Sequence, residues 1–156
     1  MPGVPVISTV ASTDGGLTVS WVLPESGGLG ILSSRVDCTA SDGATGAVTV
    51  AAPGVSGTAT GLVNGKTYAC VVRATNGVGT GEPSDPSAGV VPARTPGTVP
   101  RIVAAADDLG VKLSWGAPLD TGGATLTGYQ VTVTAADGTP AVGVTGSTTR
   151  LVAGLS

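Results

Sequence analysis

Histidine and phenylalanine are absent from this sequence of 156 residues, and cysteine, tryptophan and tyrosine occur only twice each. Without histidine, the chain lacks the commonest general base and a frequent zinc ligand. Glutamate, lysine, glutamine and methionine together fill only six positions, too few strong helix formers for a helical bundle. We therefore expect no enzyme, no catalytic residues, no bound metal and no cofactor.

Charge is also scarce, since charged residues make up 11% of the chain and the net charge is −3. The seven basic residues are scattered singly, not gathered in a stripe that could follow phosphates, so we expect no nucleic-acid partner. No apolar run approaches the ~20 residues of a spanning helix, so we expect no membrane insertion. The first five residues lack the features of a signal peptide. Either an export signal has been removed, or the protein does not use that route.

Valine, threonine and glycine dominate what is present, with 23, 22 and 26 copies, and proline adds 11. β-Branched residues suit strands, and glycine and proline suit turns, so the composition predicts an all-β protein with many short strands. Leu17, Val19 and Trp21 alternate with polar residues, as expected of a strand with one buried face. The same period of two recurs over residues 34–39, 68–74 and 129–133.

One sequence pattern occurs twice, at a shift of 93 to 95 residues. Residues 17–24 (LTVSWVLP) align with 111–118 (VKLSWGAP), and each copy continues to a double glycine and then to an Asp-Gly pair, which favours a hairpin turn. The repeat predicts two tandem domains, residues 2–94 and 95–156. Three prolines over residues 92–100 favour an extended, semi-rigid connection between them.

The residues around and after the first tryptophan carry a family resemblance. They are Trp21, Pro24, Gly27-Gly28 and the run Leu62-x-x-Gly65-x-x-Tyr68-x-x-x-Val72-x-Ala74-x-Asn76-x-x-Gly79-x-Gly81-x-x-Ser84. This order resembles the fibronectin type III domain over nearly all of residues 2–94. The second copy is similar to it through Trp115, Pro118, Gly122-Gly123 and Tyr129. The resemblance implies tandem immunoglobulin-like β-sandwiches, each with strands A, B and E packed against C′, C, F and G.

The same resemblance implies a position for each of the two cysteines. Cys38 would lie late in strand C and Cys70 early in strand F, and these strands are antiparallel neighbours in the family. We therefore expect a Cys38–Cys70 disulfide, which would stabilise the first domain by roughly 3.5 to 4 kcal/mol on a chain-entropy model. The alternative is two buried free thiols acting as small apolar residues. Val133 stands at the Cys38 position of the second copy, so that copy does not require the bridge.

Four aromatic residues are expected in the two cores, where they would serve structure and not sugar binding: Trp21, Tyr68, Trp115 and Tyr129. The resemblance implies that the Tyr68 hydroxyl bonds back to the chain before strand F, as a tyrosine corner. Ser34 departs from the family, which usually has an aromatic residue there, and so leaves a gap that a neighbour must fill. Because no aromatic side chain is left for an exposed platform, we do not expect carbohydrate binding.

Two short motifs and a set of separate aspartates suggest chemistry but lack the context that it needs. Residues 65–67 (GKT) resemble the end of a phosphate-binding loop, but a strand pattern follows them instead of a helix. Residues 77–81 lack dinucleotide-binding spacing and are expected to form a flexible F–G loop. Carboxylates are expected to be solvated turn residues, because they match no calcium loop and no cleft for acid–base work is indicated: Asp14, Asp107, Asp108, Asp120 and Asp137.

The second copy stops short of strands F and G. Gly154-Leu155 corresponds to Gly61-Leu62, which lies before the Tyr68 equivalent. Strand C would then expose an unpaired edge and the apolar row of Tyr129, Val131 and Val133. We therefore expect this sequence to be a fragment of a longer protein, with completion by a strand from another subunit as the alternative.

The resemblance and composition together imply a non-catalytic structural or adhesive spacer module of a bacterial secreted or surface-displayed protein. Two alternatives stay open: a virion appendage or decoration protein of a bacteriophage, and an accessory module of a secreted polysaccharide-degrading enzyme. The expected partners are proteins or neighbouring copies in a larger assembly. The expected location is extracellular, on a bacterial surface or on a virion.

Overall fold

The computed structural model describes residues 1–108, 110–134, 138 and 140–153. In these residues the regular structure consists of strands β1 to β12, which confirms the all-β prediction. The described part of the chain contains no helix long and apolar enough to cross a membrane. Two compact units are present, Met1–Arg94 with Gly122–Ala124, and Thr95–Thr121 with Thr125–Ser156.

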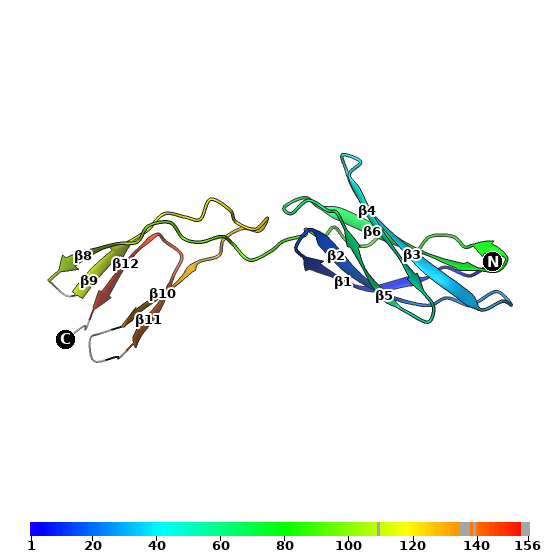
Figure 1. Cartoon of the computed structure of the whole chain (residues 1–156), viewed down its shortest axis with the longest axis horizontal. Helices are drawn as coiled ribbons and strands as arrows, with labels where there is room; N and C mark the ends of the chain where they lie inside the picture. Colours follow the sequence, from blue (N-terminus) through cyan, green and yellow to red (C-terminus); the bar gives the residue numbers. More distant parts are fainter. Residues whose placement is uncertain (109, 135–137, 139, 154–156) are drawn as a thin grey trace. The chain divides into compact units, whose positions relative to one another are not determined.

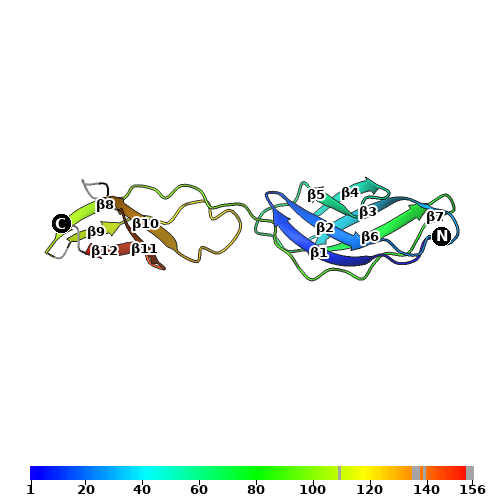
Figure 2. The ribbon, with the colours of Figure 1, turned by 90° about the horizontal axis from the view of Figure 1, so that it is seen from below.

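The first unit is a sandwich of two antiparallel sheets, seen as two layers in Figures 1 and 2. One sheet has the order β1-β2-β5, formed by β1 (Val6–Thr13), β2 (Gly16–Val22) and β5 (Ser56–Thr60). The other has the order β4-β3-β6-β7, formed by β3 (Ile31–Ala40), β4 (Thr45–Ala51), β6 (Tyr68–Asn76) and β7 (Gly79–Thr80). This is the predicted packing of A, B and E against C′, C, F and G.

Alternation along the strands explains which side chains fill the space between the sheets. In β2, Leu17, Val19 and Trp21 are at most 2% exposed. In β6 every second residue from Tyr68 to Asn76 is buried, while the residues between them are half-buried. Successive side chains of a strand point to opposite faces, so these two rows meet across the sandwich and form one core.

Asp42-Gly43 forms the predicted turn between β3 and β4. The Ala44 N–H donates to the Asp42 side chain at 3.2 Å, and Gly43 adopts a φ of 85°, a conformation that favours glycine. The loop after β6 is shorter than the flexible loop predicted over residues 77–81, because Gly79–Thr80 pairs with β6 as strand β7. The loop prediction is therefore wrong for those two residues.

The second unit repeats five of the seven strands of the first. Its three-stranded sheet has the order β12-β9-β8, from β8 (Val103–Asp107), β9 (Gly110–Ser114) and β12 (Thr149–Ala153). Its two-stranded sheet pairs β10 (Tyr129–Thr134) with β11 (Pro140–Thr145). Among the residues that the structure describes in this unit, no strand corresponds to β6 or β7.

Candidate functional site

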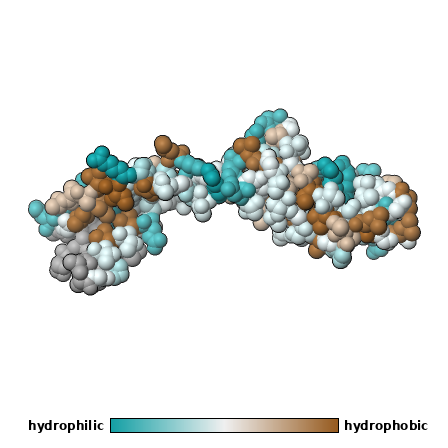
Figure 3. Space-filling view, viewed as in Figure 1, coloured by the Kyte–Doolittle hydropathy of each residue, from teal (hydrophilic) through white to brown (hydrophobic). Residues whose placement is uncertain are grey.

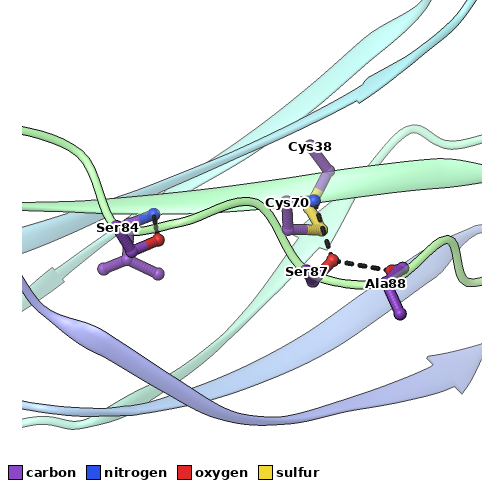
Figure 4. Close-up of a disulfide and its surroundings, with 6 residues drawn as sticks. Cys38, Cys70, Ser84, Ser87 and Ala88 are labelled. Atoms are coloured by element: carbon purple, nitrogen blue, oxygen red, sulfur yellow. Dashed lines mark hydrogen bonds between the residues drawn. A yellow bond between two sulfur atoms is a disulfide. The ribbon is translucent and has the colours of Figure 1, made fainter.

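The disulfide between Cys38 and Cys70 is the chemically distinctive feature of the first unit (Figure 4). The register of β3 against β6 places the two residues directly opposite each other. Both residues point into the sandwich, both are fully buried, and their sulfur atoms are 2.04 Å apart. The bond therefore joins adjacent strands of one sheet inside the core, where solvent does not reach it.

The segment after β7 runs along the edge of β6, beside Cys70, without forming a regular strand (Figure 4). Prolines at positions 83 and 86 remove two N–H donors from it, which prevents a continuous ladder. Two serine hydroxyls in this segment accept hydrogen bonds from N–H groups of β6 instead. The Cys70 N–H donates to Ser87 Oγ at 3.0 Å, and the Ser87 N–H donates to the Cys70 carbonyl at 2.9 Å (Figure 4). Ser84 makes the same pair of bonds with Val72, at 3.0 and 2.8 Å.

Ser84 was part of the family motif, but sequence reasoning missed Ser87 and the role that both serines share. The available signal was the run Ser-Asp-Pro-Ser over residues 84–87, in which proline excludes a strand while two hydroxyls remain as acceptors. Each hydroxyl also donates to a nearby carbonyl, that of Asp85 or Ala88, at 2.9 Å. The backbone of β6 is therefore satisfied on both of its edges.

The four aromatic residues singled out in the sequence all lie between the sheets of their units. Trp21 is 2% exposed and Tyr68 is 1% exposed, and the Tyr68 hydroxyl accepts a hydrogen bond from the Val63 N–H at 3.1 Å. In the second unit, Trp115 is 9% exposed and meets the half-buried Tyr129 edge to face, with ring centroids 5.5 Å apart. None of these four rings offers an exposed platform for a sugar.

Ser34 occupies the core position where the family usually has an aromatic residue. It is 1% exposed, and its hydroxyl has no hydrogen-bond partner among the described residues. The half-buried Val50, opposite Ser34 in the β3–β4 ladder, packs against the same core. A buried hydroxyl without a partner costs stability, so this position is not optimised for the sandwich.

Asn76 organises the end of the first unit that carries the N-terminus. It is 3% exposed, and its Nδ2 donates to the carbonyls of Ser26 and Leu29 at 2.7 and 3.3 Å. Its Oδ1 accepts from the N–H groups of Val78 and Gly79 at 2.9 and 3.2 Å. One buried side chain therefore holds together two loops that are about fifty residues apart in sequence. The sequence analysis placed Asn76 in the family motif but did not reveal this bridging role.

Hydrophobic side chains gather at this same end of the first unit (Figure 3). Met1, Leu29 and Val78 are 57%, 50% and 60% exposed, and we call them the loop-end patch. A Cβ built on Gly79 would lie 3.8 Å from Met1, and one built on Gly77 would lie 3.2 Å from Leu29, so the three residues surround one turn. The patch is therefore an exposed apolar surface where two loops of this unit meet Met1.

The charged residues of the candidate motifs lie in turns or in surface ion pairs. Asp14 accepts a hydrogen bond from Asn64 Nδ2 at 2.7 Å. Lys66 donates to Asp42 at 2.5 Å, and this hydrogen bond lowers the pKa of the Asp42 carboxyl and raises the pKa of Lys66. Lys66 therefore joins a surface ion pair and not a phosphate loop.

The remaining carboxylates give no metal site in the described residues, where no three acidic or cysteine side chains come together. Asp107 ends β8, at its turn into β9, while Asp108 follows it and is exposed. The Asp120 carbonyl accepts from the Gly97 N–H at 2.8 Å. The Asp137 position lies outside the described residues, so its expected place in a turn stays a prediction.

A groove of about 560 Å³ runs between β1 and the serine-bearing segment of the first unit. Its walls include Pro5, Ile7 and Val10 on one side and Pro86 and Val90 on the other. Asp85 is the only ionisable residue that lines it. The groove therefore holds one carboxylate and no second ionisable side chain that could act with it as an acid–base pair.

Comparison with known proteins agrees with this description. The family model for the fibronectin type III domain matches residues 3–90. A comparison with curated proteins found no match.

Among solved structures, the chain is similar to the twitchin kinase region from C. elegans, with 24% identity and a TM-score of 0.53, over 60% of this chain and 17% of that one. It is also similar to a structure described as a myokine, with 18% identity and a TM-score of 0.50, over 59% of this chain and 99% of that one. At these identities the likeness shows the shared fold alone. The match to the first structure spans less than a fifth of its length.

Proposed function

Because the chain belongs to the fibronectin type III family, we propose that it is a non-catalytic structural and adhesive spacer module of a secreted or surface-displayed protein. The observation that carries the proposal is the Cys38–Cys70 disulfide inside the core of the sandwich. Disulfides form and persist in oxidising compartments and are rare in the cytosol. A cross-linked sandwich therefore suits an extracellular setting, where a module must resist unfolding without help from chaperones.

The side chains that could perform chemistry have structural roles instead, and this supports a module without catalysis. Both cysteines are bonded to each other, and Lys66 is paired with Asp42. The aromatic rings fill the cores, as described above. The Thr-, Val- and Gly-rich composition resembles that of bacterial secreted repeats, and on that basis we assign the parent protein to the bacterial surface or secreted class.

The loop-end patch is the surface that we assign to protein partners or neighbouring copies. Exposed apolar side chains at the meeting point of several loops are a common feature of binding surfaces, because rigid strands hold the loops in place. Asn76 provides that rigidity here through its four hydrogen bonds. Asn76 therefore holds together the two loops that present the patch.

Exchanging the module in its parent protein tests this proposal. Residues 3–90 are replaced by an unrelated sandwich of the same length, and an epitope tag placed after the module is labelled on intact producing cells. A spacer predicts that the tag stays exposed at the wild-type level. Deletion of residues 3–90 without replacement is the matched control and should reduce labelling. Equal labelling of all three proteins, or no labelling of the wild type on intact cells, contradicts the proposed role.

A further inference from the structure

Two arginines lie directly opposite each other on the outer face of the β4-β3-β6-β7 sheet. Arg35 in β3 and Arg73 in β6 are partners in the ladder between these strands. Their side chains are 57% and 41% exposed, and they alternate with the buried residues of their strands, so both point away from the core. Like charges directly opposite each other in a sheet are destabilising. The pair therefore costs stability unless a negative group lies between its members.

Asp37 supplies one carboxylate to this pair. Arg35 Nε donates to the two oxygens of Asp37 at 2.9 and 3.2 Å, and Arg73 Nη1 lies 3.7 Å from Asp37 Oδ2. Among the described residues, the terminal nitrogens of Arg35 and the whole Arg73 side chain have no hydrogen-bond acceptor. We call these three residues the arginine cluster. With two positive charges and one negative charge, it keeps a positive charge and several N–H donors for a further anion.

The second unit shows that the sandwich does not require this cluster. Val36 faces Val48 as Val131 faces Gly143, so β3 corresponds to β10 at a shift of 95 residues. At that shift, Gln130 stands in the place of Arg35 and Thr132 in the place of Asp37. Both residues are uncharged and exposed. The fold therefore tolerates neutral residues here, and the charges are a particular property of the first unit.

Small, uncharged side chains surround the arginine cluster on this face. By the registers of the sheet, its nearest neighbours are Ser33, Ala47, Thr49, Val71 and Thr75. None of them is larger than valine, so the two guanidinium groups can be reached by a partner whose surface lies flat against the sheet. Arginine is enriched among the residues that dominate the energetics of protein interfaces. The face therefore offers two such groups where no neighbouring side chain blocks access to them.

We propose that Arg35 and Arg73 bind a carboxylate presented by a protein partner. Guanidinium groups match the two oxygens of a carboxylate, and Asp37 already contacts both arginines in this way. Nucleic acids and other polyanions need a row of cations, but the other basic residues of this unit, Lys66 and Arg94, lie outside the strands of the sheet. The inference is independent of the loop-end patch and of the proposed function.

NMR titration of the isotope-labelled full chain with a capped hexaglutamate peptide tests the proposal. The Nε–H signals of the two arginines report on the cluster, and a capped hexaglutamine peptide is the neutral control. Hexaglutamate should move both signals along saturable curves with an affinity of roughly 1 mM. Hexaglutamine should move neither signal. The shifts should shrink as salt is added, because exposed charges are screened.

Two variants with equal net charge separate the cluster from charge in general. R35Q/R73Q should weaken hexaglutamate binding roughly fivefold, because it removes two exposed ion pairs. K66Q/K112Q removes the same charge elsewhere and should change the affinity by less than about twofold. Binding to both is followed by the amide signals of β3 and β6, which also show whether each variant is folded.

Asp37→Asn distinguishes binding from a merely structural role of the cluster. If the partner's carboxylate takes a place beside Asp37, removal of the competing charge should tighten hexaglutamate binding roughly threefold. If Asp37 and the arginines only stabilise one another, the same substitution would leave binding unchanged or weaken it. The latter result would contradict the proposal.

Four other results would overturn it. The first is an unsaturable response, or the same response to hexaglutamine. The second is equal weakening in R35Q/R73Q and K66Q/K112Q. The third is a heparin tetrasaccharide that moves the arginine signals at concentrations tenfold lower than hexaglutamate, which would point to a sulfated polysaccharide. The fourth is movement of these signals with protein concentration alone, which would show that a second copy supplies the carboxylate.

Discussion

Replacing both cysteines by valine tests how much the disulfide contributes to the first unit. The two positions are 32 residues apart, and the chain-entropy relation for a loop of that size gives about 3.7 kcal/mol of stabilisation through the unfolded state. Valine keeps the core apolar and nearly filled, and it already occupies the Cys38 position of the second unit as Val133. The variant C38V/C70V should therefore lose stability mainly through the bond itself.

Equilibrium urea unfolding of C38V/C70V, followed by Trp21 fluorescence, measures this loss. Both proteins carry W115F, so that one tryptophan reports on the first unit. We expect the free energy of unfolding to fall by roughly 3 to 4 kcal/mol and the melting temperature to fall by roughly 15 to 30 °C. The urea slope should rise, because the unfolded chain without the cross-link exposes more surface. A loss below about 1 kcal/mol would refute the assignment of this stability to loop closure.

Four further predictions concern single positions. Trp21→Ala should cost about 3 to 5 kcal/mol, as expected for deleting a large buried ring, and a melting temperature within a degree or two of the parent would contradict its core position. Ser34→Ala should raise the free energy of unfolding by about 1 kcal/mol, because it removes a buried hydroxyl without a partner in the described structure; urea titration that shows a loss instead would mean that the hydroxyl is bonded. Asn76→Ala should cost about 1 to 3 kcal/mol and speed amide exchange in both loops that it holds, and exchange unchanged in either loop would argue against the bridge. The Asp42–Lys66 pair should stabilise the fold only while both groups are charged. Because the pKa of Asp42 is lowered from its ordinary value of 3.8, the stabilisation is present above pH 3.8 and is lost as the pH falls further. Because the pKa of Lys66 is raised from its ordinary value of 10.5, the stabilisation is present below pH 10.5 and is lost as the pH rises further. Urea unfolding across pH should therefore show a difference between wild type and D42N that is constant between these values, and a difference that varies with pH inside that window would contradict the pairing.

Alternation and turn residues predicted the strands of an all-β protein because each strand has one buried face. The inward positions of β2 and β6 follow from a period of two, and Asp42-Gly43 marks a hairpin. The family motif then supplied what periodicity does not contain, namely which strands are neighbours. The order of strands in the first unit followed from that resemblance.

The sequence pattern did not predict the hydrogen bonds between segments that are far apart along the chain. The bonds from Asn76 to Ser26 and Leu29, and those from Ser84 and Ser87 to β6, depend on tertiary proximity that no local spacing reveals. Both cases use polar side chains to satisfy buried backbone groups where proline or a loop interrupts the ladder. The loop predicted over residues 77–81 was too long for the same reason, since Asn76 closes a tight turn that lets β7 pair.

Thiol alkylation of the protein from its natural producer tests the central claim most directly, that this is a disulfide-bonded sandwich of an exported module. The protein is denatured without reductant, treated with an alkylating reagent and weighed by mass spectrometry. The account predicts no alkylation and a mass that lacks both cysteine thiol hydrogens, because Cys38 and Cys70 are bonded to each other. Alkylation of both cysteines in natively prepared protein would contradict it.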